Sequence, residues 1–190
     1  MDSSVIGSAA KGLSAWYSSL ASPIFYIVLG VFMAFAVKQG LSYALSSDMP
    51  VVAVLSQSMQ HDDASHTHYG WLEDTYGYSE EYIDSWPVPT GFLVGDMPVI
   101  EGSGVYKVGD VIVYSISCDD YPMYSCDIPI IHRIIKINDD GTYQTKGDNN
   151  LHQLPYEFSV PEGQIHGKVV TVIPKVGYFK VTMTNLFGMM

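Results

Sequence analysis

Residues 51–59 read VVAVLSQSM, and the rest of the chain is organised around this stretch. The apolar run 51–55 is typical of a β-strand, and it ends in two serines that are two positions apart. Side chains alternate between the faces of a strand, so Ser56 and Ser58 are expected to point in the same direction. A serine held at the end of a rigid strand is a candidate nucleophile, although Ser-x-Ser is also typical of an ordinary polar turn.

The composition favours one folded domain and argues against several classes of partner. The chain has 190 residues, 47% of them hydrophobic, which is enough for one full-sized core. Its net charge is −11, and it contains only nine lysines and arginines. Because phosphate binding needs clustered cations, no nucleic-acid partner is expected.

The N-terminal part contains a candidate membrane anchor. Residues 1–22 are small and polar and are expected to form a short tail, whereas residues 23–45 are mostly apolar. A helix of about 22 residues spans about 33 Å, which is enough for a bilayer core of roughly 30 Å. We therefore expect a transmembrane helix over 23–45, uncleaved and in contact with lipid. A buried core helix and a cleavable signal peptide, with a small-x-small site at 44–46, are the alternatives.

Residues 60–94 differ in character from the sequence on either side. They are acidic, aromatic and rich in turn residues, so we expect an insert or lid within a larger domain over 46–190. His61, His66 and His68 suggest a metal site. Their loose spacing favours a solvated loop instead, and no metal ion or other cofactor is predicted.

Strand patterns dominate the chain after the insert. Glycine- and aspartate-containing turns lead into most of the apolar or alternating segments, which lie at 97–100, 110–117, 128–137, 142–146 and 167–174. The expected fold class is therefore mainly β, behind an N-terminal helix.

One predicted hairpin brings together residues that could form a catalytic site. The turn at 138–141 closes a hairpin whose register places His132 opposite Asp148, or opposite Gly147 or Asn149 if the register shifts. An imidazole beside a carboxylate is the arrangement of a general base and the acid that orients it. A histidine among aliphatic neighbours is, however, often a structural residue.

The two cysteines, Cys118 and Cys126, bracket a short polar stretch. Outside the cytoplasm they could close a small disulfide loop, and in a reducing compartment they would be free thiols. The compartment of the protein therefore decides their chemistry.

The order of these motifs resembles a known family of membrane proteases. Ser58-Met59 follows an apolar run, and after it come VGDVIVY at 108–114, IIHRI at 130–134 and TKGDNN at 145–150. In this order, behind an apolar N-terminal segment, they are similar to the type I signal peptidases of archaea and of the eukaryotic endoplasmic reticulum. The resemblance extends over roughly 51–59 and 95–172.

The resemblance implies a signal-peptidase-like β catalytic domain with an N-terminal transmembrane helix. The implied activity is that of a serine endopeptidase that removes signal peptides from exported preproteins after small residues. By their places in the motifs, Ser58 would be the nucleophile, His132 the general base and Asp148 the acid. Ser56 would contribute to the oxyanion hole, and Val54 would lie beside the substrate.

One departure from the family pattern concerns the acid. The second aspartate of the family, six residues after Asp148, is Leu154 here, and Glu157 or the turn at 139–140 are remote substitutes. The resemblance also implies a single-pass protein of the cell membrane with an extracytoplasmic catalytic domain. Its partners would be preprotein signal peptides, membrane lipid and the protein-export channel. The alternatives are a catalytically inactive, membrane-tethered peptide-binding homologue and a secreted β-rich protein.

Overall fold

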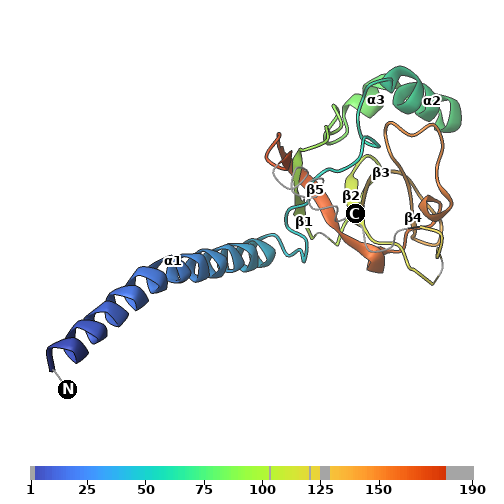
Figure 1. Ribbon diagram of the computed structural model, residues 1–190. Coiled ribbons are helices and arrows are strands. Elements are labelled where there is room, and N and C mark those ends of the chain that lie inside the picture. Colours follow the sequence, from blue (N-terminus) through green and yellow to red (C-terminus); the bar gives the residue numbers. More distant parts are fainter. Residues whose placement is uncertain (1–2, 103, 120, 125–128, 179–190) are drawn as a thin grey trace. The chain divides into compact units, whose positions relative to one another are not determined.

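The computed structural model describes residues 3–102, 104–119, 121–124 and 129–178, which fall into two compact units, Met1–Ala44 and Leu45–Met190. Helix α1 (Ser3–Ala44) makes up the first unit (Figure 1). Residues 3–22, expected to form a tail, are thus helical, and alanine, the best helix former, recurs among them. Within the described residues, Pro23–Ala44 is the one helical stretch long and apolar enough to cross a membrane, with a mean hydropathy of 1.9.

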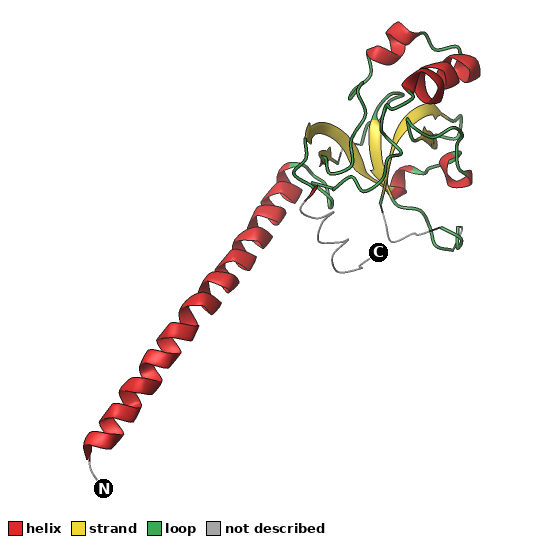
Figure 2. Ribbon diagram, turned by 45° about the horizontal axis from the view of Figure 1, so that its top comes forward, coloured by secondary structure: helices red, strands yellow, loops and turns green. Residues whose placement is uncertain are grey.

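The second unit is built on a five-stranded antiparallel sheet with the strand order β1-β5-β2-β3-β4 (Figures 1 and 2). The strands are β1 (Met97–Glu101), β2 (Val111–Tyr114), β3 (Ile130–Ile137), β4 (Tyr143–Lys146) and β5 (Ile165–Ile173). Each lies within or overlaps a segment with a strand pattern in the sequence. The mainly-β fold class with an N-terminal helix is therefore confirmed.

The central strand β2 is covered by hydrophobic core on both faces. Val111 and Val113 belong to one core cluster, and the alternating residues Ile112 and Tyr114 belong to another. All four side chains are buried, as expected for a strand without a solvent-facing side. The Tyr114 hydroxyl finds its hydrogen bond inside the core, with the Thr145 hydroxyl at 2.9 Å.

Strands β3 and β4 form the predicted hairpin, with one irregularity in their pairing. Near the turn, Ile137 pairs with Tyr143. Beyond an irregularity at 134–136, Arg133 pairs with Lys146, so the register has shifted by one residue. Because side chains alternate along a strand, such a shift changes which residues after β4 face a given residue of β3.

The insert 60–94 contains three short helices that are packed on the sheet. They are η1 (Ser65–Gly70), α2 (Trp71–Tyr76) and α3 (Glu80–Asp84), and Figure 1 shows α2 and α3 together beside the strands. Leu72, Ile83 and Trp86 form a buried cluster with Ile135 of β3. The insert is therefore part of the folded second unit.

Of the two cysteines, only Cys118 lies among the described residues, and it is disulfide-bonded. Cys126 lies outside them. The predicted loop between the two cysteines stays a prediction.

Candidate active site

The segment 51–55 is held in an extended conformation beside β1. The N–H groups of Val52 and Val54 donate to carbonyl groups in and next to β1, at 3.2 and 2.9 Å. Among the described residues, the backbone groups of Ala53 and Leu55, which alternate with these, have no hydrogen bond. Val54, expected to lie beside the substrate, is 5% exposed and belongs to the core. The backbone groups without a hydrogen bond belong to Ala53, which is also buried, and to Leu55, which is exposed.

Ser56 and Ser58 lie at the end of this segment with their hydroxyl groups together. Their Oγ atoms are 3.1 Å apart, so the two side chains point in the same direction, as expected from the sequence. Ser58 Oγ also lies 3.1 Å from Nε2 of His132. In the described part of the chain the Ser58 N–H has no hydrogen-bond partner, so it is free to donate to a negatively charged oxygen.

His132 is held on its other side by a carboxylate that is not Asp148. The ring is buried on β3, and its Nδ1 is hydrogen-bonded to Oε1 of Glu157. Glu157 ends the short helix η2 (Pro155–Glu157) and is completely buried, and its Oε2 accepts the Leu154 N–H at 2.6 Å. Ser58, His132 and Glu157 are thus linked in the order of nucleophile, base and orienting acid.

The expected pairing of His132 with Asp148 is wrong. Arg133 donates to the Asp148 carboxylate through Nε at 3.0 Å and through Nη2 at 2.7 Å. Continued by one residue, the shifted register places Gly147 opposite His132, which is one of the alternatives expected from the sequence. Asp148 is the next residue, so its side chain points to the other face, where the side chain of Arg133 also lies. The acid that contacts His132 comes from η2, which follows the hairpin.

Asp148 and Arg133 form a buried ion pair. Burial on its own would raise the pKa of Asp148, but the Arg133 guanidinium and a hydrogen bond from His61 lower that pKa well below its usual range. The remaining donors of Arg133 bind the backbone carbonyls of Pro87, Val88 and Gly109. Since a guanidinium has five N–H groups, every donor of Arg133 has an acceptor.

The loop after β4 holds Ser58 through its backbone. The Asn149 N–H donates to the Ser58 carbonyl at 2.8 Å. A Cβ atom at Gly147 would lie 2.7 Å from that same carbonyl oxygen and 2.9 Å from His132 Nε2. Both distances are shorter than side-chain contacts allow, so glycine is required beside the Ser58–His132 pair.

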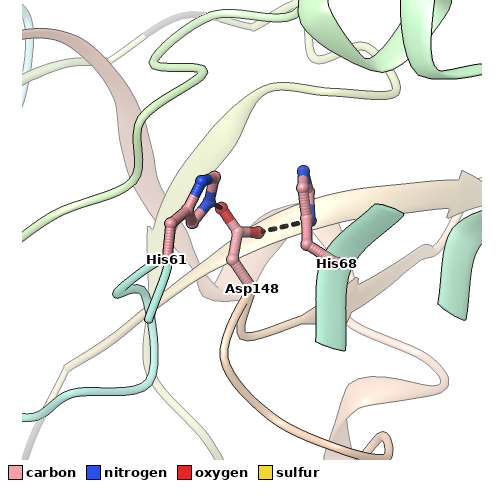
Figure 3. A group of neighbouring side chains, drawn as sticks. All are labelled: His61, His68 and Asp148. Atoms are coloured by element: carbon pink, nitrogen blue, oxygen red, sulfur yellow. Dashed lines mark hydrogen bonds and ion pairs between the residues drawn. The ribbon is translucent and has the colours of Figure 1, made fainter. Parts of the chain in front are cut away.

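The three histidines of the insert fall into two groups. His66 is exposed and hydrogen-bonds to Asp63 at 2.8 Å. His61 and His68 lie inward, on either side of Asp148 (Figure 3). Burial lowers the pKa of His68 to about 4, so its ring is neutral at neutral pH. The solvated-loop prediction is wrong for His61 and His68, because tertiary contacts with a residue far along the sequence bury them.

A second set of serine, histidine and aspartate side chains was not anticipated from the sequence. Ser115 Oγ lies 2.8 Å from His166 Nε2, and His166 Nδ1 lies 3.0 Å from Asp48. The Ser115 N–H, however, donates to the carbonyl of Gln164 at 3.0 Å, so it cannot bind an oxyanion. This network joins β5 to the segment before the active site. It differs from the Ser58 site because the N–H of its serine is already hydrogen-bonded.

The chain is similar to catalytic subunits of signal peptidase complexes from fungi, while no family model matches it. The SEC11 subunit of Leptosphaeria maculans is 27% identical over 177 residues, which cover 87% of this chain and 82% of that protein. The subunit of Metarhizium robertsii is 28% identical over 164 residues, or 80% and 74% of the two chains. That of Tuber melanosporum is 29% identical over 176 residues, or 87% and 80%. The resemblance to the type I signal peptidases of the endoplasmic-reticulum branch is thereby confirmed.

Proposed function

We propose that the chain is a membrane-anchored serine endopeptidase that removes N-terminal signal peptides from exported preproteins, cutting after small residues. The observation that carries the proposal is the line of contacts from Ser58 through His132 to Glu157. The names of the relatives support signal-peptide removal as the reaction, since each is a signal peptidase catalytic subunit.

In the first step, Ser58 Oγ attacks the carbonyl carbon of the scissile peptide bond. His132 Nε2 takes the hydroxyl proton during the attack, because an alcohol is a poor nucleophile while it keeps its proton. The Glu157 carboxylate accepts the Nδ1–H, which fixes the tautomer with a free Nε2 and stabilises the imidazolium that forms.

The negative charge that develops on the carbonyl oxygen needs hydrogen-bond donors. The Ser58 N–H is free to donate, and the Ser56 hydroxyl lies 3.1 Å from the nucleophilic oxygen. Each such donor is worth roughly 3 kcal/mol in the transition state. Protonated His132 then gives its proton to the leaving amine, and water hydrolyses the acyl ester on Ser58 with His132 again as the base.

The substrate docks as an extended strand beside the segment 51–55, on the side of its unpaired backbone groups. The unpaired backbone groups of Ala53 and Leu55 provide the hydrogen-bonding groups that such a strand needs. Docking beside them brings the scissile bond to Ser58, a few residues further along. Close approach to this edge favours small side chains before the cut.

In this proposal Asp148 acts as a positioning residue. It holds Arg133, the neighbour of the base, and it starts the loop whose Asn149 N–H binds the Ser58 carbonyl. It therefore supports both the nucleophile and the base without contacting either reacting atom.

The proposal places residues 23–45 in the membrane and the catalytic domain 46–190, with its lid 60–94, on the extracytoplasmic side. The apolar stretch Pro23–Ala44 has the length of a membrane span. The disulfide-bonded state of Cys118 agrees with an oxidising compartment. Membrane lipid, preprotein signal peptides and the protein-export channel are then its partners, in the cell membrane or the endoplasmic reticulum.

The test is cleavage of a synthetic preprotein by the purified full-length chain in detergent or lipid. We expect cleavage by the unchanged protein and by Ser115→Ala, and none by Ser58→Ala or His132→Ala, with the fold retained by circular dichroism. Full activity of Ser58→Ala would refute the assignment. Peptide binding without cleavage by the unchanged protein would favour the inactive peptide-binding homologue.

A further inference from the structure

Two histidines and an aspartate converge at the contact between the insert and the loop after β4. His61 Nε2 lies 2.9 Å from Asp148 Oδ2, and His68 Nδ1 lies 3.5 Å from Asp148 Oδ1 (Figure 3). The three ligand-type atoms all lie within 4.8 Å of one another. His68 and Asp148 are buried, and the His61 side chain is 15% exposed, so His61 is the ligand nearest solvent.

We propose that His61, His68 and Asp148 bind a divalent transition-metal ion of the zinc type, with water completing its coordination. Two imidazole nitrogens and one carboxylate oxygen form a ligand set that suits zinc and its neighbours in the first transition series. A tetrahedral ion with bonds of about 2.1 Å separates its ligand atoms by about 3.4 Å. The 3.5 Å between His68 and Asp148 matches this separation, and the 2.9 Å between His61 and Asp148 is shorter, so the His61 ring has to move outward.

The His61 ring can complete the site by a small movement. Its ring nitrogen makes one hydrogen bond in the described part of the chain, the one to Asp148, and the ring lies against His68 with the centroids 5.0 Å apart. An ion between the rings replaces that hydrogen bond with two metal bonds. Because His61 is the ligand nearest solvent, its ring is the one that would move when an ion enters the site.

Arg133 prepares the carboxylate without filling the site. It binds Asp148 through Nε and Nη2, while its other donors are taken by backbone carbonyls. A carboxylate has about four acceptor positions, so the two that point away from Arg133 remain directed at the histidines. Groups that orient a ligand in this way belong to the outer shell of many metal sites.

A bound ion would fix the insert to the body beside the candidate active site. His61 and His68 belong to the insert, whereas Asp148 follows Gly147, whose backbone lies against Ser58 and His132. The ion has no part in the reaction proposed above. Its effect is on the stability of the insert, and it applies equally to a protein in which Ser58 has been replaced.

The test measures zinc binding to the untagged full-length protein in detergent, after removal of metal with a chelator. We expect one zinc ion per chain by calorimetry and a rise in melting temperature with zinc but not with magnesium, which prefers oxygen ligands. His61→Ala and His68→Ala should each weaken binding by at least about tenfold. The matched control is His66→Ala, which removes an exposed histidine of the same insert and should leave binding unchanged.

His61→Ala and a cobalt measurement keep the proposal falsifiable if His68→Ala fails to fold. His61→Ala changes a partly exposed residue and is expected to fold, so it decides the question by itself. Cobalt(II) should give visible absorption bands in the unchanged protein and in Ser58→Ala, and lose them in His61→Ala. Absence of zinc binding in the unchanged protein, or equal affinity in folded His61→Ala, would overturn the proposal.

Discussion

Replacing Glu157 with glutamine tests the part of the site that differs from the sequence-based expectation. The side chain keeps its size, and its carbonyl oxygen can still accept the Leu154 N–H that now binds Glu157 Oε2 at 2.6 Å. Its amide group, however, donates to His132 Nδ1 and thereby forces the proton onto Nε2. His132 could then no longer accept the proton of Ser58, 3.1 Å away.

The expected loss of activity is much larger than the expected loss of stability. Removing the acid of a Ser/His/Asp triad lowers kcat by on the order of 10⁴-fold, or about 5.5 kcal/mol at about 1.36 kcal/mol per factor of ten. Weakening one buried hydrogen bond costs about 1 kcal/mol of folding free energy. The variant should therefore be folded and bind substrate with an unchanged KM while its kcat is nearly abolished.

The assay is steady-state cleavage of a fluorogenic signal-peptide substrate, with thermal unfolding measured on the same samples. Glu162→Gln changes an exposed glutamate of the next short helix, η3 (Glu162–Gln164), and should leave both measurements unchanged. If folded Glu157→Gln kept more than about a tenth of the activity, the role drawn from the His132 contact would be refuted.

Three other substitutions give separate tests. Gly147→Ala should lower kcat by roughly 100-fold, because the added Cβ displaces Ser58 or His132, whereas Gly163→Ala meets no atom within 4 Å and should be neutral in the same assay. Asp148→Asn should destabilise the fold by about 3–5 kcal/mol in urea denaturation, because it removes the charge that pairs with buried Arg133, and a change under about 1 kcal/mol would contradict the ion pair. Ser56→Ala should lower kcat by roughly 10²-fold at constant KM if its hydroxyl binds the oxyanion, and an unchanged kcat would exclude it from that role.

The strands were predictable from the sequence because their signals are local. Apolar alternation and the turn at 138–141 are enough to place β3 and β4 and to pair them. The same local signals made Ser58 and His132 only candidates, because their contact joins distant parts of the chain. Those two residues were identified by the motif resemblance, which carries long-range information that periodicity lacks.

The acid could not be chosen from the sequence for a physical reason. Its identity depends on a one-residue irregularity at 134–136, which moves Asp148 away from the position opposite His132. The turn residues at 138–141 do not predict this irregularity. Glu157 was one of several acids near the right place, and only the fold of η2 brings its carboxylate to the imidazole. The inward position of His61 and His68 was missed for the same reason, since their partner lies on another part of the chain.

Arg133 also determines how freely the insert could be engineered. Two of its donors end on the carbonyls of Pro87 and Val88, at 2.7 and 2.9 Å, near the end of the insert. A shortened chain that lost these carbonyls would leave two buried N–H groups unpaired, at about 1–3 kcal/mol each. The segment 60–94 therefore cannot be removed or exchanged without affecting Arg133. A chimera that transplants or trims it must keep Pro87 and Val88 in register with Arg133, or replace the arginine and Asp148 together with uncharged side chains.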